Sequence, residues 1–313
     1  MESLDKTNKT MRAIVVSDSQ KGNEGMILTD VPMAIADLND VVVQVYASGF
    51  TGNELTWPSS WADRAGRDRT PSIPGHELAG VVVELGYGTT GVSIGQRVFG
   101  LTDWTRNGTL AEYVAVESRN LAPLPADVDF KDGAALVMSG LTAWQGLYVH
   151  GNLQAGQTVL IHGAAGIVGS MAVQLARSTG AYVIGTGHTS GRQAALDYGV
   201  HKYIDLDTES VEESGGVDLV FDVFGGDIAH QSAALVRNGG RLISIAGPTD
   251  AQPANGTTID FVVEAIPAQL EAIVQLFRQG TIKTNIGVVT PLNDAVKALN
   301  QQSKGKIITY MQQ

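Results

Sequence analysis

The chain has 313 residues, a length that accommodates two domains. Its 43% hydrophobic and 17% charged residues are typical of a soluble globular protein. Thirty-two acidic residues against 21 basic ones give a net charge of −11, which argues against nucleic acid or an anionic membrane surface as a partner. No apolar run approaches the roughly 18–20 residues that a membrane span requires.

Two further features of composition concern location and chemistry. The first ten residues are polar and lack the apolar segment of a secretory signal, so residues 1–10 are predicted to be a disordered leader on a cytoplasmic protein. The chain contains no cysteine. Disulfides, thiol nucleophiles and thiolate metal sites are therefore excluded.

Residues 1–125 show a β-rich pattern, in which short segments rich in Val and aromatic residues alternate with Gly/Pro turns. This pattern predicts a barrel-like or sandwich-like β domain. The expected strands are "RAIVV" (12–16), "DVVVQVYA" (40–47), "GVVVELG" (80–86), "QRVFGL" (96–101) and "LAEYVAV" (110–116).

Residues 126–282 show a different pattern, in which apolar strands alternate with amphipathic helices. This alternation is typical of a doubly wound parallel sheet. The expected strands are 158–163, 181–187, 202–207, 217–223 and 240–247, and the expected helices are 167–180, 192–199, 227–239 and 267–280. Residues 283–313 indicate a helix and then one strand, which needs a sheet to join. The β-rich first domain is the expected host.

The strongest local motif is a small-residue turn between the first of these strands and its helix. Residues 164–169 fit A-x-G-x-x-G, and a strand–turn–helix context is what such a motif requires to bind a pyrophosphate. Small residues let the backbone approach the phosphates, and the helix N-terminus supplies unpaired N–H groups. The predicted cofactor contacts are Gly163, Ala164, Ala165, Gly166, Ile167, Val168 and Gly169.

The end of the second parallel strand bears on the choice between NADH and NADPH. An NAD site usually has an acidic residue there to hold the ribose hydroxyls. This chain has no acid between Gly166 and Leu196, and it carries "TGHTSGRQ" (186–193) instead. Basic and hydroxyl side chains can bind a 2′-phosphate, so NADPH is the predicted cofactor. The predicted contacts are Thr186, His188, Ser190 and Arg192; a solvated loop with an incidental arginine is the alternative.

Taken together, the motifs "IPGHELAGVVVELG", "VLIHGAAGIVG", "VDLVFDVFGG", "GGRLISIAG" and "GKII" resemble the medium-chain dehydrogenase/reductase superfamily, in its zinc-free quinone oxidoreductase (zeta-crystallin-like) branch. The resemblance spans the chain from Met11 onward. It implies an α/β fold, with a GroES-like β-rich catalytic domain from residues 1–125 and 283–313 and a Rossmann NADP-binding domain from 126–282. It also implies an active site in the cleft between the two domains, and a homodimer in which "TIDFVV" (258–263) is a candidate edge strand.

The resemblance also suggests a test for a metal site. In the zinc alcohol dehydrogenases of this superfamily, the catalytic ligands Cys, His and Cys match Thr51, His76 and Met138. A neutral hydroxyl and a thioether are poor zinc ligands, so no metal is predicted. Glu54 or Glu77 can in principle substitute as ligands. His76 is predicted to be a hydrogen-bonded positioning residue rather than a ligand.

Other site residues follow from the same resemblance. Thr51 lies where the family often has a pocket Asn, although it can instead bond its own backbone. Asn53 is a second polar candidate, and Trp57 lies near the position of a family Tyr. Trp57, Trp61 and Trp104 can together wall a pocket for a flat substrate. "DRAGRDR" (63–69) is either a solvated loop or a lid that binds an acidic tail. The implied contacts with the nicotinamide half of the cofactor are Thr142, Phe224, Ala246, Gly247 and Lys306, a surface lysine being the alternative for the last.

These observations predict an NADPH-dependent, zinc-independent reductase that transfers hydride to a quinone or an α,β-unsaturated carbonyl compound. Conjugation makes such acceptors electron-poor, so they need less help from a Lewis acid than an alcohol does. The alternatives are an NADPH-binding sensor or structural protein with little turnover and, less favoured, a zinc alcohol dehydrogenase with atypical ligands.

Overall fold

The computed structural model describes residues 9–311 and divides the chain into two units. The first unit contains the chain up to Val137 together with Ala265–Val274 and Ile286 onward, and the second contains Met138–Glu264 and Gln275–Asn285. Two of the four boundaries fall inside helices α1 (Phe130–Trp144) and α5 (Pro267–Arg278), and the other two directly precede Ala265 and Ile286. Of the predicted leader, residues 1–8 lie outside the described residues, and Thr10 already belongs to strand β1.

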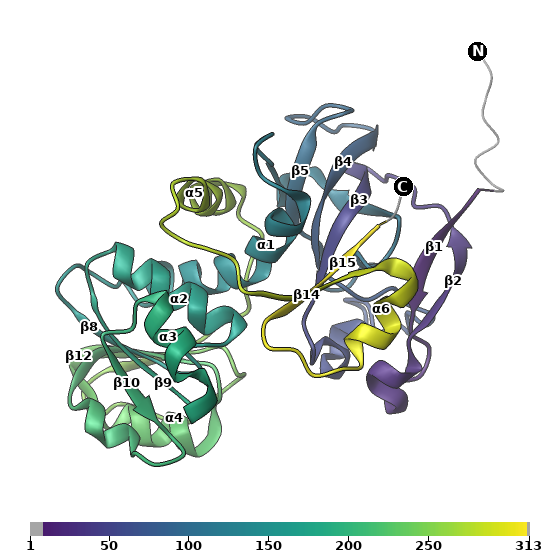
Figure 1. The fold of residues 1–313 in the computed structure, drawn as a ribbon. Coiled ribbons are helices and arrows are strands. Elements are labelled where there is room, and N and C mark those ends of the chain that lie inside the picture. The colour runs from purple at the N-terminus through teal and green to yellow at the C-terminus, as the bar shows by residue number, and fades with distance from the viewer. Residues whose placement is uncertain (1–8, 312–313) are drawn as a thin grey trace. The chain divides into compact units, whose positions relative to one another are not determined.

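The first unit is built on a seven-stranded sheet in the described part of the chain (Figure 1). The strand order is β14-β15-β3-β4-β5-β7, and β6 also pairs with β3. The strands are β3 (Asp40–Phe50), β4 (Glu77–Leu85), β5 (Arg97–Leu101), β6 (Tyr113–Glu117), β7 (Leu121–Pro123), β14 (Ile286–Pro291) and β15 (Lys306–Tyr310), and a separate hairpin joins β1 (Thr10–Val15) to β2 (Ile27–Pro32).

The C-terminal strand joins this sheet, as its sequence predicted. β15 pairs antiparallel with β3, with Ile307 opposite Phe50. Helix α6 (Leu292–Leu299) precedes it and buries Leu292, Ala295 and Leu299 in the same core as β3 and β4. Burial of these apolar side chains compensates for ordering the returning segment.

The second unit holds a parallel six-stranded sheet within the described residues. The strand order is β10-β9-β8-β11-β12-β13. From β8 the chain adds strands on one side as far as β10, and from β11 it adds them on the other side of β8. Ligands of such sheets bind at this switch point, at the carboxyl ends of the strands. The strands are β8 (Thr158–Ile161), β9 (Tyr182–Gly187), β10 (Lys202–Asp205), β11 (Val217–Asp222), β12 (Val236–Ser244) and β13 (Thr257–Asp260), and the helices are α2 (Ile167–Ser178), α3 (Arg192–Tyr198) and α4 (Gly226–Ala233).

One predicted helix is too long. The helix expected over 227–239 ends at Ala233, and Val236 already pairs with Val217 as the first residue of β12. Leucine and valine fit a helix or a buried strand equally well by periodicity, so pairing with β11 decides the outcome here. The segment expected at 258–263 is strand only to Asp260, where β13 forms one edge of the sheet. None of the helices within residues 9–311 is long and apolar enough to cross a membrane.

Candidate functional site

The predicted phosphate-binding turn lies between β8 and α2. Gly166 precedes the first helical residue, and no side chain of the described residues caps this helix end. A Cβ on Gly169 would lie 2.0 Å from the carbonyl oxygen of Gly163, so only glycine allows this close packing of helix against turn. The open helix N-terminus and the bare backbone fit a pyrophosphate group.

A residue that the sequence did not indicate supports this turn. The side-chain nitrogen of Asn285 lies 3.1 Å from the carbonyl oxygen of Ala165 and 3.3 Å from that of Gly166. It also lies 3.3 Å from Ser170 Oγ in the first turn of α2. Because Asn285 is more than a hundred residues away in sequence, no local pattern could have identified it.

The loop after β9 contains the residues predicted to recognise a 2′-phosphate. The guanidinium of Arg192 lies 5.3 Å from the ring centroid of Tyr203 and 3.4 Å from Glu209 Oε2. His188 Nδ1 lies 2.6 Å from Asp207 Oδ1, and this carboxylate raises the pKa of His188. Ser190 is exposed.

These contacts correct part of the sequence interpretation. Residues 167–195 do lack acids, but Asp207 and Glu209 reach the same loop from the segment after β10. Both predicted bases therefore already have a carboxylate partner. A 2′-phosphate would have to replace or share these partners.

Thr186 lies in the interior and contacts a histidine. Its hydroxyl is 2.7 Å from His162 Nδ1, and His162 Nε2 is 2.8 Å from Ser232 Oγ. All three residues are buried, and burial lowers the pKa of His162 to about 4. His162 is thus neutral at pH 7 and links β8, β9 and α4. We assign Thr186 to this internal network and not to the cofactor surface.

Other predicted cofactor residues lie where the parallel strands end. Phe224 follows β11 and is half exposed, and Ala246 and Gly247 follow β12. The carboxylate of Asp222 fixes the first turn: its Oδ1 accepts N–H bonds from Phe224 at 2.9 Å and Gly225 at 3.1 Å. The remaining candidate, Thr142, is a buried residue of α1.

In the first unit, His76 lies against two tryptophans. The ring centroid of Trp104 is 4.8 Å from that of His76, and Trp57 lies 5.5 Å from Trp104 and 6.2 Å from His76. We call Trp57, His76 and Trp104 the aromatic cluster. Nδ1 of His76 lies 3.1 Å from Thr102 Oγ1. Burial, followed by the positive charge of Arg69, lowers the pKa of His76 to about 4, so the ring is neutral at pH 7.

The other nearby candidates have different surroundings. Trp61 does not join the cluster: its indole N–H donates to the carbonyl of Leu55 at 2.9 Å and the ring packs on the core. Asn53 is exposed, and its carbonyl accepts a bond from the Thr56 hydroxyl at 2.7 Å. Thr51 is partly exposed, and its backbone N–H donates to Glu54 Oε2 at 3.3 Å.

Three buried ionisable residues, Glu54, Glu77 and Lys306, belong to the same unit. Glu77 and Lys306 form an ion pair whose side chains are 1% and 3% exposed. The ammonium of Lys306 is therefore bound to Glu77 and buried, whereas the sequence predicts it near the cofactor ribose or at the surface. Glu54 accepts backbone N–H bonds from Gly75 and Thr51, and burial raises its pKa to about 8.

The raised pKa of Glu54 predicts a pH dependence of stability. Between its ordinary value of 4.5 and about 8, the folded state binds the proton more tightly than the unfolded state does. The free energy of unfolding should therefore fall as pH rises through this window, relative to the Glu54→Gln variant. Guanidinium unfolding of both proteins at pH 5 and pH 8 measures this difference. Parallel profiles would show that Glu54 does not titrate in this way.

The donor set at His76 does not fit a zinc ion. The positions that match the two cysteine ligands of zinc relatives carry the Thr51 hydroxyl and the Met138 thioether, and neither group is a good zinc ligand. Within residues 9–311, no three His, Asp or Glu side chains are grouped so that they could hold a metal ion.

Comparison with known proteins agrees with the two-unit fold. Family models for an alcohol dehydrogenase GroES-like domain and a zinc-binding dehydrogenase match residues 37–126 and 168–283. The quinone oxidoreductase of Sus scrofa is 31% identical over 291 residues, covering 86% of this chain and 87% of its own. That of Mus musculus is 28% identical over 312 residues, covering 93% of each. The solved quinone oxidoreductase of Coxiella burnetii, 24% identical, has a TM-score of 0.88 and covers 97% of this chain and 100% of its own. The chain therefore belongs to the medium-chain dehydrogenase/reductase superfamily of nicotinamide-dependent oxidoreductases, in the quinone oxidoreductase branch.

Proposed function

We propose that the chain is an NADPH-dependent reductase that transfers hydride to a quinone or an α,β-unsaturated carbonyl compound without zinc. The observation that carries this proposal is the aromatic cluster. A neutral, buried His76 faces two tryptophans where zinc relatives have a metal ligand. Such a surface favours a flat, electron-poor acceptor over an alcohol that must be ionised by a metal.

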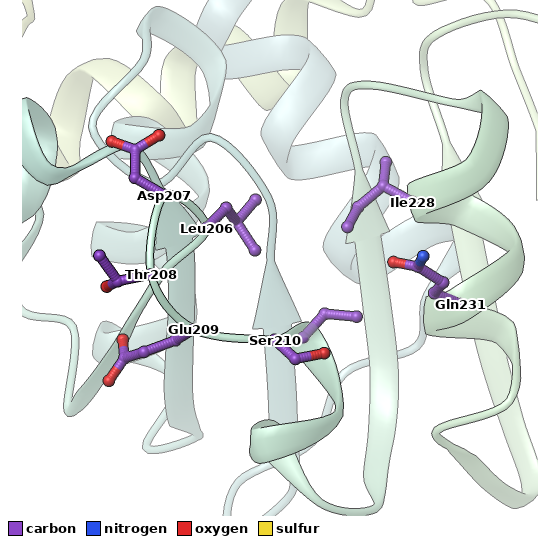
Figure 2. A pocket seen from close by; sticks show the side chains of 8 residues that line it. Leu206, Asp207, Thr208, Glu209, Ser210, Ile228 and Gln231 are labelled. Atoms are coloured by element: carbon purple, nitrogen blue, oxygen red, sulfur yellow. The ribbon is translucent and has the colours of Figure 1, made fainter.

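The second unit has candidate positions for the pyrophosphate and the adenine of the dinucleotide. The pyrophosphate fits at the N-terminus of α2, over Gly166. For the adenine we propose the hollow of about 480 Å³ between the segment that follows β10 and helix α4. Figure 2 shows the residues after β10 on one side of this hollow and Ile228 and Gln231, from α4, on the other. Leu206 and Ile228 provide apolar surface for a planar base.

Arg192 is the residue on which the preference for NADPH depends most. The Tyr203 ring lies under its guanidinium and fixes the plane of that group. The contact between Arg192 and Glu209, at 3.4 Å, is long for a hydrogen bond between charged groups. A phosphate dianion offers more charge and more acceptor oxygens than this carboxylate does. We propose that the 2′-phosphate takes over Arg192, with His188 and Ser190 as further donors.

This arrangement predicts opposite effects of two substitutions on NADPH affinity. Arg192→Ala should weaken NADPH binding roughly tenfold to a hundredfold and leave NADH binding unchanged, because charged hydrogen bonds contribute about 1.5–3 kcal/mol. Glu209→Gln should strengthen NADPH binding, because the phosphate no longer competes with a carboxylate. Calorimetric titration with both cofactors measures these effects, with Arg177→Ala, at the far end of α2, as the control. Equal losses for NADH and NADPH would contradict the assignment.

On the acceptor side, we propose that Thr51 donates a hydrogen bond from Oγ1 to the acceptor oxygen. Trp57 and Trp104 orient the flat ring and exclude water. When bound, NADPH supplies a hydride, and the acceptor gains that hydride and a proton from water or a hydroxyl group. The neutral ring of His76 positions Trp57 and Trp104 and supplies no charge.

The proposal is tested by measuring NADPH oxidation with a panel of acceptors. Naphthoquinones, enones and enoyl thioesters should be reduced, and simple alcohols should not be oxidised with NADP⁺. Metal content is measured in parallel, and activity should survive chelation. Stoichiometric zinc whose removal abolishes activity would contradict the zinc-independent chemistry. Tight NADPH binding without turnover on any acceptor would favour a sensor or structural role instead.

We also propose that the protein forms a homodimer through β13. This strand leaves one sheet edge unpaired in the described part of the chain, and Val262, just beyond it, is 71% exposed. An unpaired strand edge beside apolar side chains favours association with a second copy. Light scattering after size exclusion measures the mass that tests this proposal.

A further inference from the structure

The loop between Trp61 and Ser72 places an arginine beside the aromatic cluster. The guanidinium of Arg69 donates to the carbonyl of Ser59, two residues after Trp57. On the same loop, Arg64 pairs with Asp103, which directly precedes Trp104. The loop is thus attached next to both tryptophans. Arg69 is also close enough for its charge to act on His76.

The ion pairs of this loop leave Arg69 as its unpaired cation. Arg64 pairs with Asp103, and Arg67 pairs with Asp63 at 2.7 Å. Within residues 9–311, no carboxylate lies within ion-pair distance of Arg69. The side chain is nevertheless half buried, and this burial lowers its pKa, whereas the negative charges of Asp103 and Asp63, beyond ion-pair distance, act on it in the opposite direction. A partly desolvated guanidinium with unused N–H donors is a favourable partner for an anion.

The two tryptophans define the shape of the adjoining surface. Their rings meet at 82° and both are partly exposed, so they form a corner rather than a flat stack. A planar conjugated system can lie on one ring and contact the edge of the other. His76 adds no charge to this corner, so Arg69 is the nearby group that can bind a negatively charged group of a ligand.

We propose that Arg69 and the aromatic cluster together bind a flat conjugated carbonyl compound that carries a carboxylate. The role of that compound as hydride acceptor rests on the proposed reductase function, whereas its binding does not. The guanidinium fork matches the two oxygens of a carboxylate, and the conjugated part lies against the tryptophans. Arg69 is then a specificity-determining residue.

The test uses one ligand with and without the negative charge. Trans-3-benzoylacrylate is a planar enone acid, and its methyl ester has the same conjugated system without the charge. Because the chain has no cysteine, thiol addition does not complicate binding of these compounds. Calorimetric titration without cofactor measures the affinity of the wild type, Arg69→Gln and Arg69→Lys. Arg67→Gln, on the same loop but exposed and paired with Asp63, is the matched control.

We expect the wild type to bind the acid more tightly than the ester, and added salt to weaken only the acid. Arg69→Gln should weaken acid binding roughly tenfold to a hundredfold with little change for the ester. Arg69→Lys should retain part of the preference, and Arg67→Gln all of it. With NADPH present, the same change should appear in KM for the acid and not in kcat.

Two results would overturn the proposal. One is equal affinity of the wild type for acid and ester. The other is an Arg69→Gln variant that weakens both ligands alike, because Arg69 would then only hold the turn at Ser59. If Arg69→Gln fails to fold by circular dichroism, the wild-type acid and ester affinities and Arg69→Lys decide the question. Arg69-dependent binding of the acid, without NADPH oxidation by this acid or by any acceptor of the panel, would support this inference while contradicting the reductase function.

Discussion

Gly169→Ala is expected to abolish tight NADPH binding. The new Cβ would lie 2.0 Å from the carbonyl oxygen of Gly163, far inside van der Waals contact, and that oxygen belongs to backbone which cannot rotate away. Helix α2 must therefore move from the turn, and its N-terminal N–H groups move with it. We expect affinity to fall more than a hundredfold, and the second unit to lose about 1–3 kcal/mol of stability, the usual cost of overpacking.

Gly216→Ala is a control in the same unit. There the nearest atom to a new Cβ is Nε of Arg237 at 3.3 Å, which is part of a flexible side chain that can move. This variant should bind NADPH normally. Calorimetry gives the affinities, and thermal unfolding with and without NADPH separates lost binding from lost stability. Wild-type affinity in Gly169→Ala would show that the pyrophosphate does not bind at this helix end.

The turn between β8 and α2 was predictable because its requirements are local. Gly163, Gly166 and Gly169 lie within seven residues, next to an apolar strand and an amphipathic helix, and the structure places the first two in the turn and Gly169 in the first turn of α2. The two-unit fold was predictable for a similar reason, since period-two and helical patterns change near the middle of the chain. The return of β15 to the first sheet followed from its lack of a local partner.

The charge partners were not predictable, because tertiary pairing creates them. Asp207 and Glu209 lie outside the segment in which a ribose-binding acid is expected, yet they contact His188 and Arg192. From the sequence, Glu54 is a candidate only as a substitute metal ligand. Its burial as a protonated acid could not be predicted, because no periodic pattern of residues indicates it. These residues share one property: their function depends on how a folded environment shifts charge, which residue type alone does not encode.

Lys306→Met is expected to cause a large loss of stability in the first unit. Lys306 begins β15, which pairs with β3, and its partner Glu77 begins β4 on the other side of β3. The ion pair therefore links β15, near the C-terminus, to β4, which lies more than two hundred residues earlier in the chain. Removing the ammonium leaves a buried carboxylate without its cation, which costs about 3–5 kcal/mol.

A double variant and a control variant test this role of the ion pair. Adding Glu77→Leu to Lys306→Met also removes the buried carboxylate. This double variant should regain much of the lost stability, because an apolar pair avoids the desolvation cost of a buried charge. Lys304→Met, at an exposed position two residues earlier, should change stability by no more than about 0.5 kcal/mol. Guanidinium unfolding gives the stabilities, and amide hydrogen exchange of β15 shows whether the loss is local to that strand. If Lys306→Met matched Lys304→Met in both measurements, the attachment of β15 would depend on its backbone pairing and apolar contacts, and the buried charges would need a role other than stability.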